Sequence, residues 1–123
     1  MAFSGTLTTE AECNAMVGAE VDTTIWTEAN KNAWVAQAEA YLCGICKYDL
    51  VTNYASLTSY VKGLLSEYCE RYAGLCGRAY NLEFSSDTDR LIGEDIINVH
   101  IWRMKEIAEI LKDSDYREFI IDG

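Results

Sequence analysis

The chain has 123 residues, of which 50% are hydrophobic and 24% are charged, a balance typical of one globular domain rather than of a disordered segment. Twenty acidic residues against ten basic ones give a formal net charge of −10, which disfavours conventional binding to DNA, RNA or anionic membranes. No apolar run approaches the roughly 18 residues that cross a bilayer, so we expect no membrane insertion. The N-terminus has no basic region followed by an apolar stretch, so we expect no secretory signal.

The absence of proline and the helical spacing of the apolar residues predict an all-α fold, with four helices, an extended N-terminal arm and a short C-terminal helical tail. We divide this single domain into the arm at residues 1–8, a helical core at 9–112 and the tail at 113–123. Phe3 and Leu7 are the large apolar side chains of the arm, and we expect them to dock on another chain.

Local signals place the first two helices. Thr9 and Glu12 have the spacing of a capping box, which predicts a short helix ending at Gly18. Thr27 is a suitable N-cap, and Glu28 follows in the first turn, where the helix dipole favours an acid. Apolar residues then recur at helical spacing, which predicts a second helix that ends near residues 48–49.

The third predicted helix carries a continuous apolar stripe over residues 57–79. Ser86 and Asp89 resemble the start of a fourth helix that runs to about Lys112. Asp115 and Glu118 then predict a last short turn over residues 116–121.

The fourth helix has two adjacent apolar stripes, more than a simple bundle member requires. One comprises Ile97, Ile101, Met104, Ala108 and Leu111, and the other comprises Ile92, Ile96, Val99, Ile107 and Ile110. Either this helix is central and wrapped by the other three, or its second stripe is covered by another copy or a partner. Arg103 falls in the second stripe. We expect it either to form an ion pair across that interface or to extend along its aliphatic stem so that the guanidinium reaches solvent. The predicted interface residues are Ile92, Ile96, Val99, Arg103, Ile107, Ile110, Phe3, Leu7, Phe119, Ile120 and Ile121.

Four of the five cysteines could face one another, because Cys43 and Cys46 form a CxxC and Cys69 and Cys76 lie two turns apart on the next predicted helix. Such a set could hold zinc, or Cys43 and Cys46 could act in redox chemistry. However, these cysteines fall inside amphipathic helices rather than in knuckles or loop-to-helix turns, which favours buried thiols that pack as small hydrophobes. We therefore expect no metal and no cofactor.

The remaining residues offer no catalytic motif. His100 is the only histidine, which excludes any motif that needs two and leaves no Ser-His-Asp arrangement to propose. The residue three positions after Glu94 is Ile97, so the Glu-x-x-His spacing of di-iron bundles is absent. No glycine-rich phosphate loop is present, and the glycines at 74, 77 and 93 are isolated. We therefore expect a protein that is not an enzyme.

The run from Trp26 to Lys31, leading into Ala38–Leu42, followed by Tyr68–Tyr80 and a long amphipathic helix, resembles the small helical head-to-tail connector (adaptor) proteins of tailed bacteriophages. The resemblance covers the layout of residues 24–112 and rests on helix order and composition. It implies a homo-oligomeric ring in the virion neck, between the portal and tail or neck proteins, with termini that grip neighbouring subunits. It also implies assembly in the host cytoplasm and DNA that passes through an acidic ring without specific binding. The cysteines are not part of the resemblance.

The main hypothesis from the sequence is thus a non-enzymatic virion assembly protein that acts by burying interfaces. Two alternatives remain open: a small metal-binding or redox protein that uses Cys43, Cys46, Cys69 and Cys76, and a monomeric helical regulator that binds one host protein.

Overall fold

The computed structural model describes residues 3–17, 24–82, 87–113, 116, 118 and 120, and only the backbone of 78–82, 87–94 and 96. Within these residues the chain forms four α-helices and no strand, which confirms the predicted all-α fold. The helices are α1 (Glu10–Val17), α2 (Glu28–Cys46), α3 (Ser59–Leu82) and α4 (Asp87–Lys112), and the 3-10 turn η1 (Tyr54–Ser56) lies between α2 and α3. None of the described helices is long and apolar enough to cross a membrane.

Local hydrogen bonds explain where α1 and α2 begin. The Glu12 backbone N–H donates to Thr9 Oγ1 at 3.2 Å, and the Thr9 N–H donates to Glu12 Oε1 at 3.2 Å, so the predicted capping box is present. The Asn30 N–H donates to Thr27 Oγ1 at 3.2 Å, which confirms the predicted cap of α2. Gly18, the predicted end of α1, lies outside the described residues.

The second helix ends slightly earlier than predicted. Lys47 adopts the left-handed conformation with φ 53°, and its N–H donates to the Cys43 carbonyl oxygen. This backbone conformation closes the helix after Cys46, before the predicted end near residues 48–49. The chain then passes through η1 to α3.

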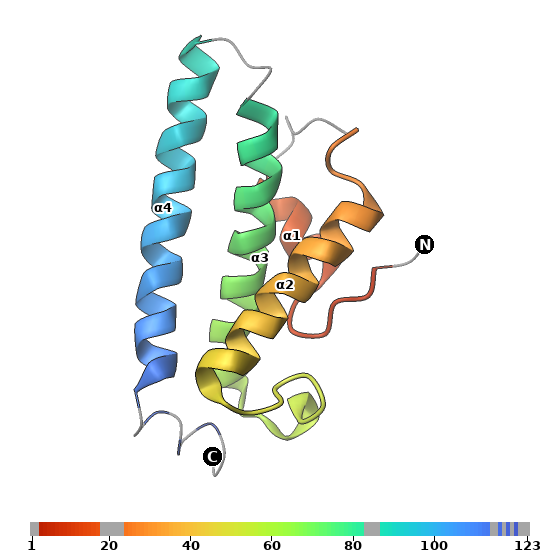
Figure 1. Ribbon diagram of the computed structural model, residues 1–123, viewed down its shortest axis with the longest axis vertical. Helices are drawn as coiled ribbons and strands as arrows, with labels where there is room; N and C mark the ends of the chain where they lie inside the picture. The colour runs from red at the N-terminus through yellow and green to blue at the C-terminus, as the bar shows by residue number, and fades with distance from the viewer. Residues whose placement is uncertain are drawn as a thin grey trace.

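The central helix is α3, because it packs against α1, α2 and α4, as Figure 1 shows. Helix α4 lies along one side of the molecule, and it contacts α3 more extensively than it contacts α2. The alternative that the fourth helix is central and wrapped by the other three is therefore wrong.

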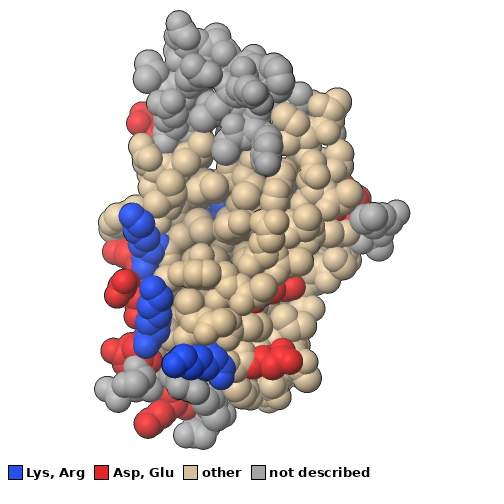
Figure 2. Space-filling model, viewed as in Figure 1, with Lys and Arg blue, Asp and Glu red and all other residues tan. Residues whose placement is uncertain are grey.

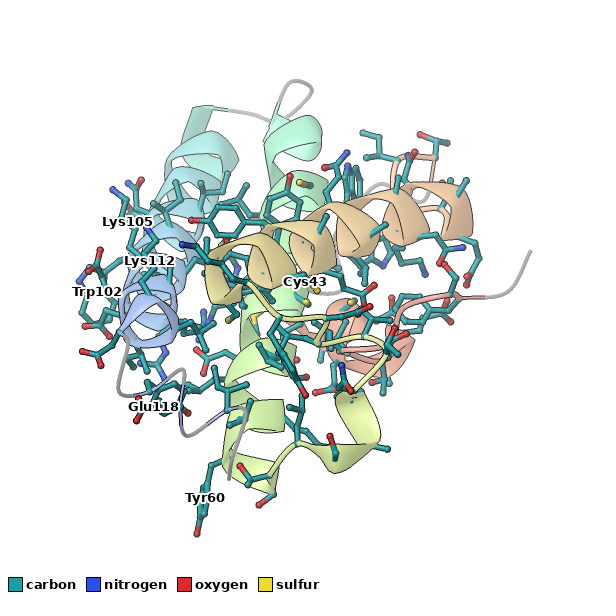
Figure 3. All side chains as sticks on the ribbon, turned by 60° about the horizontal axis from the view of Figure 1, so that its bottom comes forward. Cys43, Tyr60, Trp102, Lys105, Lys112 and Glu118 are labelled. Atoms are coloured by element: carbon teal, nitrogen blue, oxygen red, sulfur yellow. The ribbon has the colours of Figure 1, made fainter. Side chains whose placement is uncertain are left out.

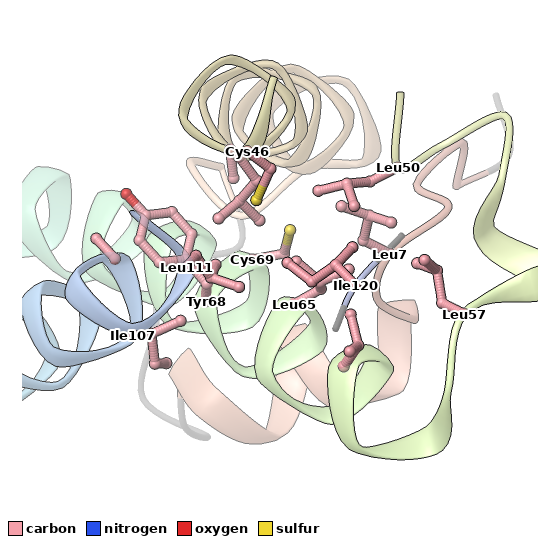
Figure 4. Close-up of a cluster of buried hydrophobic side chains, with 14 residues drawn as sticks. Leu7, Cys46, Leu50, Leu57, Leu65, Tyr68, Cys69, Ile107, Leu111 and Ile120 are labelled. Atoms are coloured by element: carbon pink, nitrogen blue, oxygen red, sulfur yellow. The ribbon is translucent and has the colours of Figure 1, made fainter. Parts of the chain in front are cut away.

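The buried side chains form two clusters, which we call the main core and the minor core. The main core joins α2, α3 and α4 and also includes Leu7 and Ile120 from the two ends of the chain, as Figure 4 shows. The minor core lies where α1 meets α2 and α3, and comprises Cys13, Trp34, Val35 and Ala73.

The N-terminal segment packs on its own chain. The backbone N–H groups of Thr6 and Leu7 donate to Glu39 Oε2 at 2.7 and 2.8 Å, and the Ser4 N–H donates to Asn32 Oδ1 at 2.9 Å. Leu7 is fully buried in the main core. The prediction that the arm docks on another chain is therefore wrong for Leu7, because α2 already binds this segment.

Candidate interaction surface

The outward side of α4 carries large apolar side chains that its own molecule does not cover. Trp102 is 61% exposed, Val99 57% and Ile110 39%, whereas Ile107 and Leu111 of the same helix are fully buried. Figure 3 shows Trp102 pointing outward from α4. A solvent-exposed tryptophan on a regular helix is a frequent anchor of protein interfaces. The same helix therefore has one face in the core and one face available to a partner.

A shallow apolar groove lies beside this face, between α4 and α2. It has a volume of about 150 Å³ and is lined by Tyr41, Tyr68, Ile101, Met104, Lys105 and Ala108. Of these lining residues, Tyr41 and Tyr68 stack with ring centroids 5.6 Å apart and an interplanar angle of 11°. Tyr41 is 44% exposed and Ile101 37% exposed, so the groove opens to solvent.

The charges on α4 are separated around the helix. Lys105 and Lys112 are seven residues apart and therefore share one edge, next to the groove. Glu106 and Asp113 each follow one residue later, which places them about 100° further round, on the side of Trp102 away from the lysines. Figure 2 shows basic side chains in a row along α4 with acidic side chains beside them, at the edge of a wide uncharged face.

Arg103 pairs within its own chain. Its Nε lies 2.5 Å from Glu67 Oε2 on α3, and its Nη1 lies 3.3 Å from Glu106 Oε2 one turn away. The hydrogen bond from Arg103 lowers the pKa of Glu67 despite partial burial, and the same bond raises the pKa of Arg103. The prediction of an ion pair across a subunit interface is therefore replaced by an intramolecular pair between α3 and α4.

The ion pair extends into a small network. Glu67 also accepts a hydrogen bond from Arg71 Nε at 2.8 Å, and Arg71 Nη1 lies 3.1 Å from Nδ1 of the buried His100. Two arginines thus share one carboxylate between the helices. His100 and Arg103 fix α4 against α3, which is a structural role.

Three other predicted interface residues are also placed in the core. Leu7, Ile107 and Ile120 are at most 3% exposed and belong to the main core. A side chain so buried cannot contact another subunit, so the interface prediction is wrong for these three. Phe3 is half-buried and packs against the minor core. The side chains of Ile92 and Ile96, and residues Phe119 and Ile121, lie outside what the structure describes, whereas Val99 and Ile110 are exposed.

The cysteines divide between the two cores. Cys46 and Cys69 belong to the main core with Cys43 packed against it, whereas Cys13 belongs to the minor core with Cys76 packed against it. Burial raises the pKa of Cys13 and of Cys76 to about 11 and raises that of Cys69 well above its usual value, so these groups are thiols at neutral pH. Among the described residues, no three His, Cys, Asp or Glu side chains are placed to hold a metal ion.

The sequence reasoning missed Trp102 and Glu67. Trp102 follows Val99 at a three-residue spacing, which was sufficient to place both side chains on neighbouring parts of one face. Glu67 could not be found this way, because its partner Arg103 is 36 residues away on another helix.

Comparison with protein-family models, with curated proteins and with solved structures finds no match to this chain.

Proposed function

We propose that this chain is a structural subunit that assembles head to tail with copies of itself, in the manner implied by its resemblance to phage head-to-tail connector proteins. The observation that carries the proposal is the exposed Trp102 on α4, together with an apolar groove on the same helix whose lining does not include Trp102. Trp102 and the groove are neighbouring but distinct patches of α4, which suits a contact between different patches of successive copies.

The charges support a second copy as the partner. We call Trp102 the knob and the groove between α2 and α4 the hole. On α4, Glu106 and Glu109 lie next to the knob, whereas Lys105 lines the hole and Lys112 lies one heptad further along the same edge. A copy that inserts Trp102 into the groove of its neighbour brings these acids toward those lysines. Contacts of this kind propagate, and they close into a ring when the rotation between subunits allows.

An assembly of this kind needs no catalytic group. Its subunits each carry a net charge of −10, so a ring that encloses DNA repels the phosphates and lets the duplex pass without specific binding. The proposed location is the neck of a virion, between portal and tail proteins.

Light scattering after size-exclusion chromatography tests the contact through complementation. We expect the wild type to form species larger than a dimer as its concentration rises, and Trp102→Glu (no knob) and Ile101→Glu (no hole) each to remain monomeric. Mixed together, these two variants retain one intact knob and one intact hole, so they should form a heterodimer and stop there. Tyr60→Glu is the matched control, because Tyr60 is 78% exposed on α3, away from this surface, and should assemble as the wild type does.

The outcomes separate the alternatives. A wild type that stays monomeric at every concentration overturns self-assembly and leaves the face to a different protein. A wild-type dimer that both variants disrupt and that their mixture does not restore indicates a two-fold contact and excludes a ring. Electron microscopy of the larger species should show closed rings with a channel wide enough for a DNA duplex, and open filaments would contradict the connector role.

A further inference from the structure

The one histidine of the chain, His100, is buried on α4 against an arginine of α3. Its side chain is 4% exposed, and Arg71 Nη1 lies 3.1 Å from its Nδ1. A guanidinium group carries only N–H donors and stays charged in proteins, so it cannot accept a hydrogen bond from the ring. Nδ1 is therefore the acceptor, and His100 is the neutral ring with its proton on Nε2.

The ion-pair network holds the Arg71 guanidinium in this position. Arg71 Nε donates to Glu67 Oε2 at 2.8 Å, and Arg103, one turn after His100 on α4, donates to both oxygens of the same carboxylate and pairs with Glu106. The hydrogen bond from Arg103, together with that from Arg71, lowers the pKa of Glu67. Glu67 therefore stays ionised in weak acid, and the network continues to present a cation to the ring.

Other titratable groups lie on the helices that pack against α4. On α2, Glu39 binds the N-terminal segment, Lys31 pairs with acids of α1 and α2, and Tyr41 places a neutral phenol beside α4. On α3, burial and the nearby carboxyl group of Glu12 raise the pKa of Glu70 to about 7. Glu70 therefore titrates in the range of a histidine but in the opposite sense, since its protonation favours the folded form. A test of His100 must separate the two groups.

We infer that His100 is an acid-sensitive lock between α3 and α4. The neutral ring accepts the hydrogen bond from Arg71, and a second proton, which enters at Nδ1, removes that acceptor and places two cations in contact. The two cations repel one another, so α4 loosens from α3 around His100. Val99 and Trp102 flank His100 on α4, so the same step alters the exposed face of the helix. The inference concerns a contact within one chain and holds whether or not copies assemble.

The direction of the pH dependence follows from which form takes up the second proton. A detached His100 binds it at the ordinary histidine pKa of about 6.5, whereas the locked ring resists it because Arg71 occupies Nδ1. The lock therefore contributes fully above about pH 6.5, and its contribution is lost as the pH falls below that value. Between about pH 7.5 and about pH 5.5, the equilibrium constant for opening should rise by up to about tenfold.

NMR of protein labelled with nitrogen-15 in histidine observes the ring directly, because the chain has one histidine. We expect a proton on Nε2 and none on Nδ1 at about pH 7.5. At about pH 5.5, where about nine tenths of free histidine is protonated, the ring should remain mostly neutral. Arg71→Gln keeps an N–H donor but carries no charge, so its ring should titrate close to the ordinary value. Lys112→Gln, the matched control, removes a cation from an exposed position of α4 and should titrate as the wild type does.

Hydrogen exchange measured by mass spectrometry at the same two pH values, corrected for intrinsic rates, tests whether the ring controls α4. In the wild type we expect amides of α4 around His100 to lose protection by up to about tenfold at the lower pH. His100→Gln can still accept a hydrogen bond from Arg71 but cannot take up a proton, so this loss should disappear. Both proteins retain Glu70, so the difference between them isolates His100.

Each other outcome contradicts the lock. A wild-type ring with its proton on Nδ1 at about pH 7.5 overturns it, as does a wild-type ring that titrates at the same pH as the ring of Arg71→Gln. An equal loss of α4 protection in the wild type and in His100→Gln also overturns it. Should a variant fail to fold, which circular dichroism reveals, the NMR titration of the wild type still decides.

Discussion

Two glycines on α3 provide a test of the packing, because the same substitution should have opposite effects at the two sites. A Cβ atom at Gly63 meets nothing within 4 Å. A Cβ atom at Gly77 would lie 2.8 Å from the Trp26 ring. Both residues are inside one helix, so alanine gains helix propensity at both and only the surroundings differ.

The expected magnitudes follow from these surroundings. Alanine is favoured over glycine in a helix interior by about 0.8–1 kcal/mol, so Gly63→Ala should raise the free energy of unfolding by about that much. At Gly77 the added methyl must displace the Trp26 ring, whose Nε1 donates to Asn14 Oδ1 at 2.7 Å and which packs 5.9 Å from the Trp34 ring. Overpacking of this kind costs about 1–3 kcal/mol, so after the gain in helix propensity Gly77→Ala should lose up to about 2 kcal/mol in total.

Urea unfolding followed by circular dichroism measures both changes, with thermal unfolding as a second readout. For a domain of this length, each kcal/mol corresponds to a shift in Tm of about 3–6 °C. The two variants should therefore differ in the sign of the shift. Equal stabilisation by both substitutions would show that Trp26 and α1 do not approach α3 as closely as the structure indicates.

Two further predictions concern α4 and the end of α2. Ile107→Ala should lower the free energy of unfolding by about 2–5 kcal/mol because the side chain is fully buried. Ile110→Ala, one turn away, should lower it by less than about 1 kcal/mol because Ile110 is 39% exposed. Comparable losses for the two variants would contradict the orientation of α4. Lys47→Gly should raise the free energy of unfolding by about 0.5–1 kcal/mol, because Lys47 has φ 53° and glycine adopts this conformation without strain. Lys105→Gly, inside α4, should lower it by about 1 kcal/mol. Chemical denaturation of the two variants measures both changes.

The helices were predictable because their signals are local. The capping box of Thr9 and Glu12 and the N-cap Thr27 are formed between residues three apart, so the sequence alone locates the starts of α1 and α2. The apolar period likewise placed α3 and α4 close to their observed bounds. The end of α2 was less predictable, since it depends on the backbone conformation of Lys47, which its side chain does not signal.

The proposed interaction surface was predictable only in part. The second apolar stripe of α4 correctly suggested a face with surplus apolar surface, and Val99 and Ile110 are exposed there. Ile107 was assigned to the same stripe but is fully buried, because a pattern around one helix does not show how far its neighbours reach. The proposed surface instead combines the exposed Trp102 with the groove between α2 and α4, neither of which the stripe indicated.

The sequence by itself determined the all-α class and the helix starts, because each depends on hydrogen bonds and spacings within a few residues. Only the tertiary structure decided that α3 is central, that Glu39 binds the N-terminal segment, and that Glu67 pairs with Arg103. These contacts join residues about thirty or more positions apart, and the choice among possible partners depends on how whole helices pack and which charges that packing brings within reach.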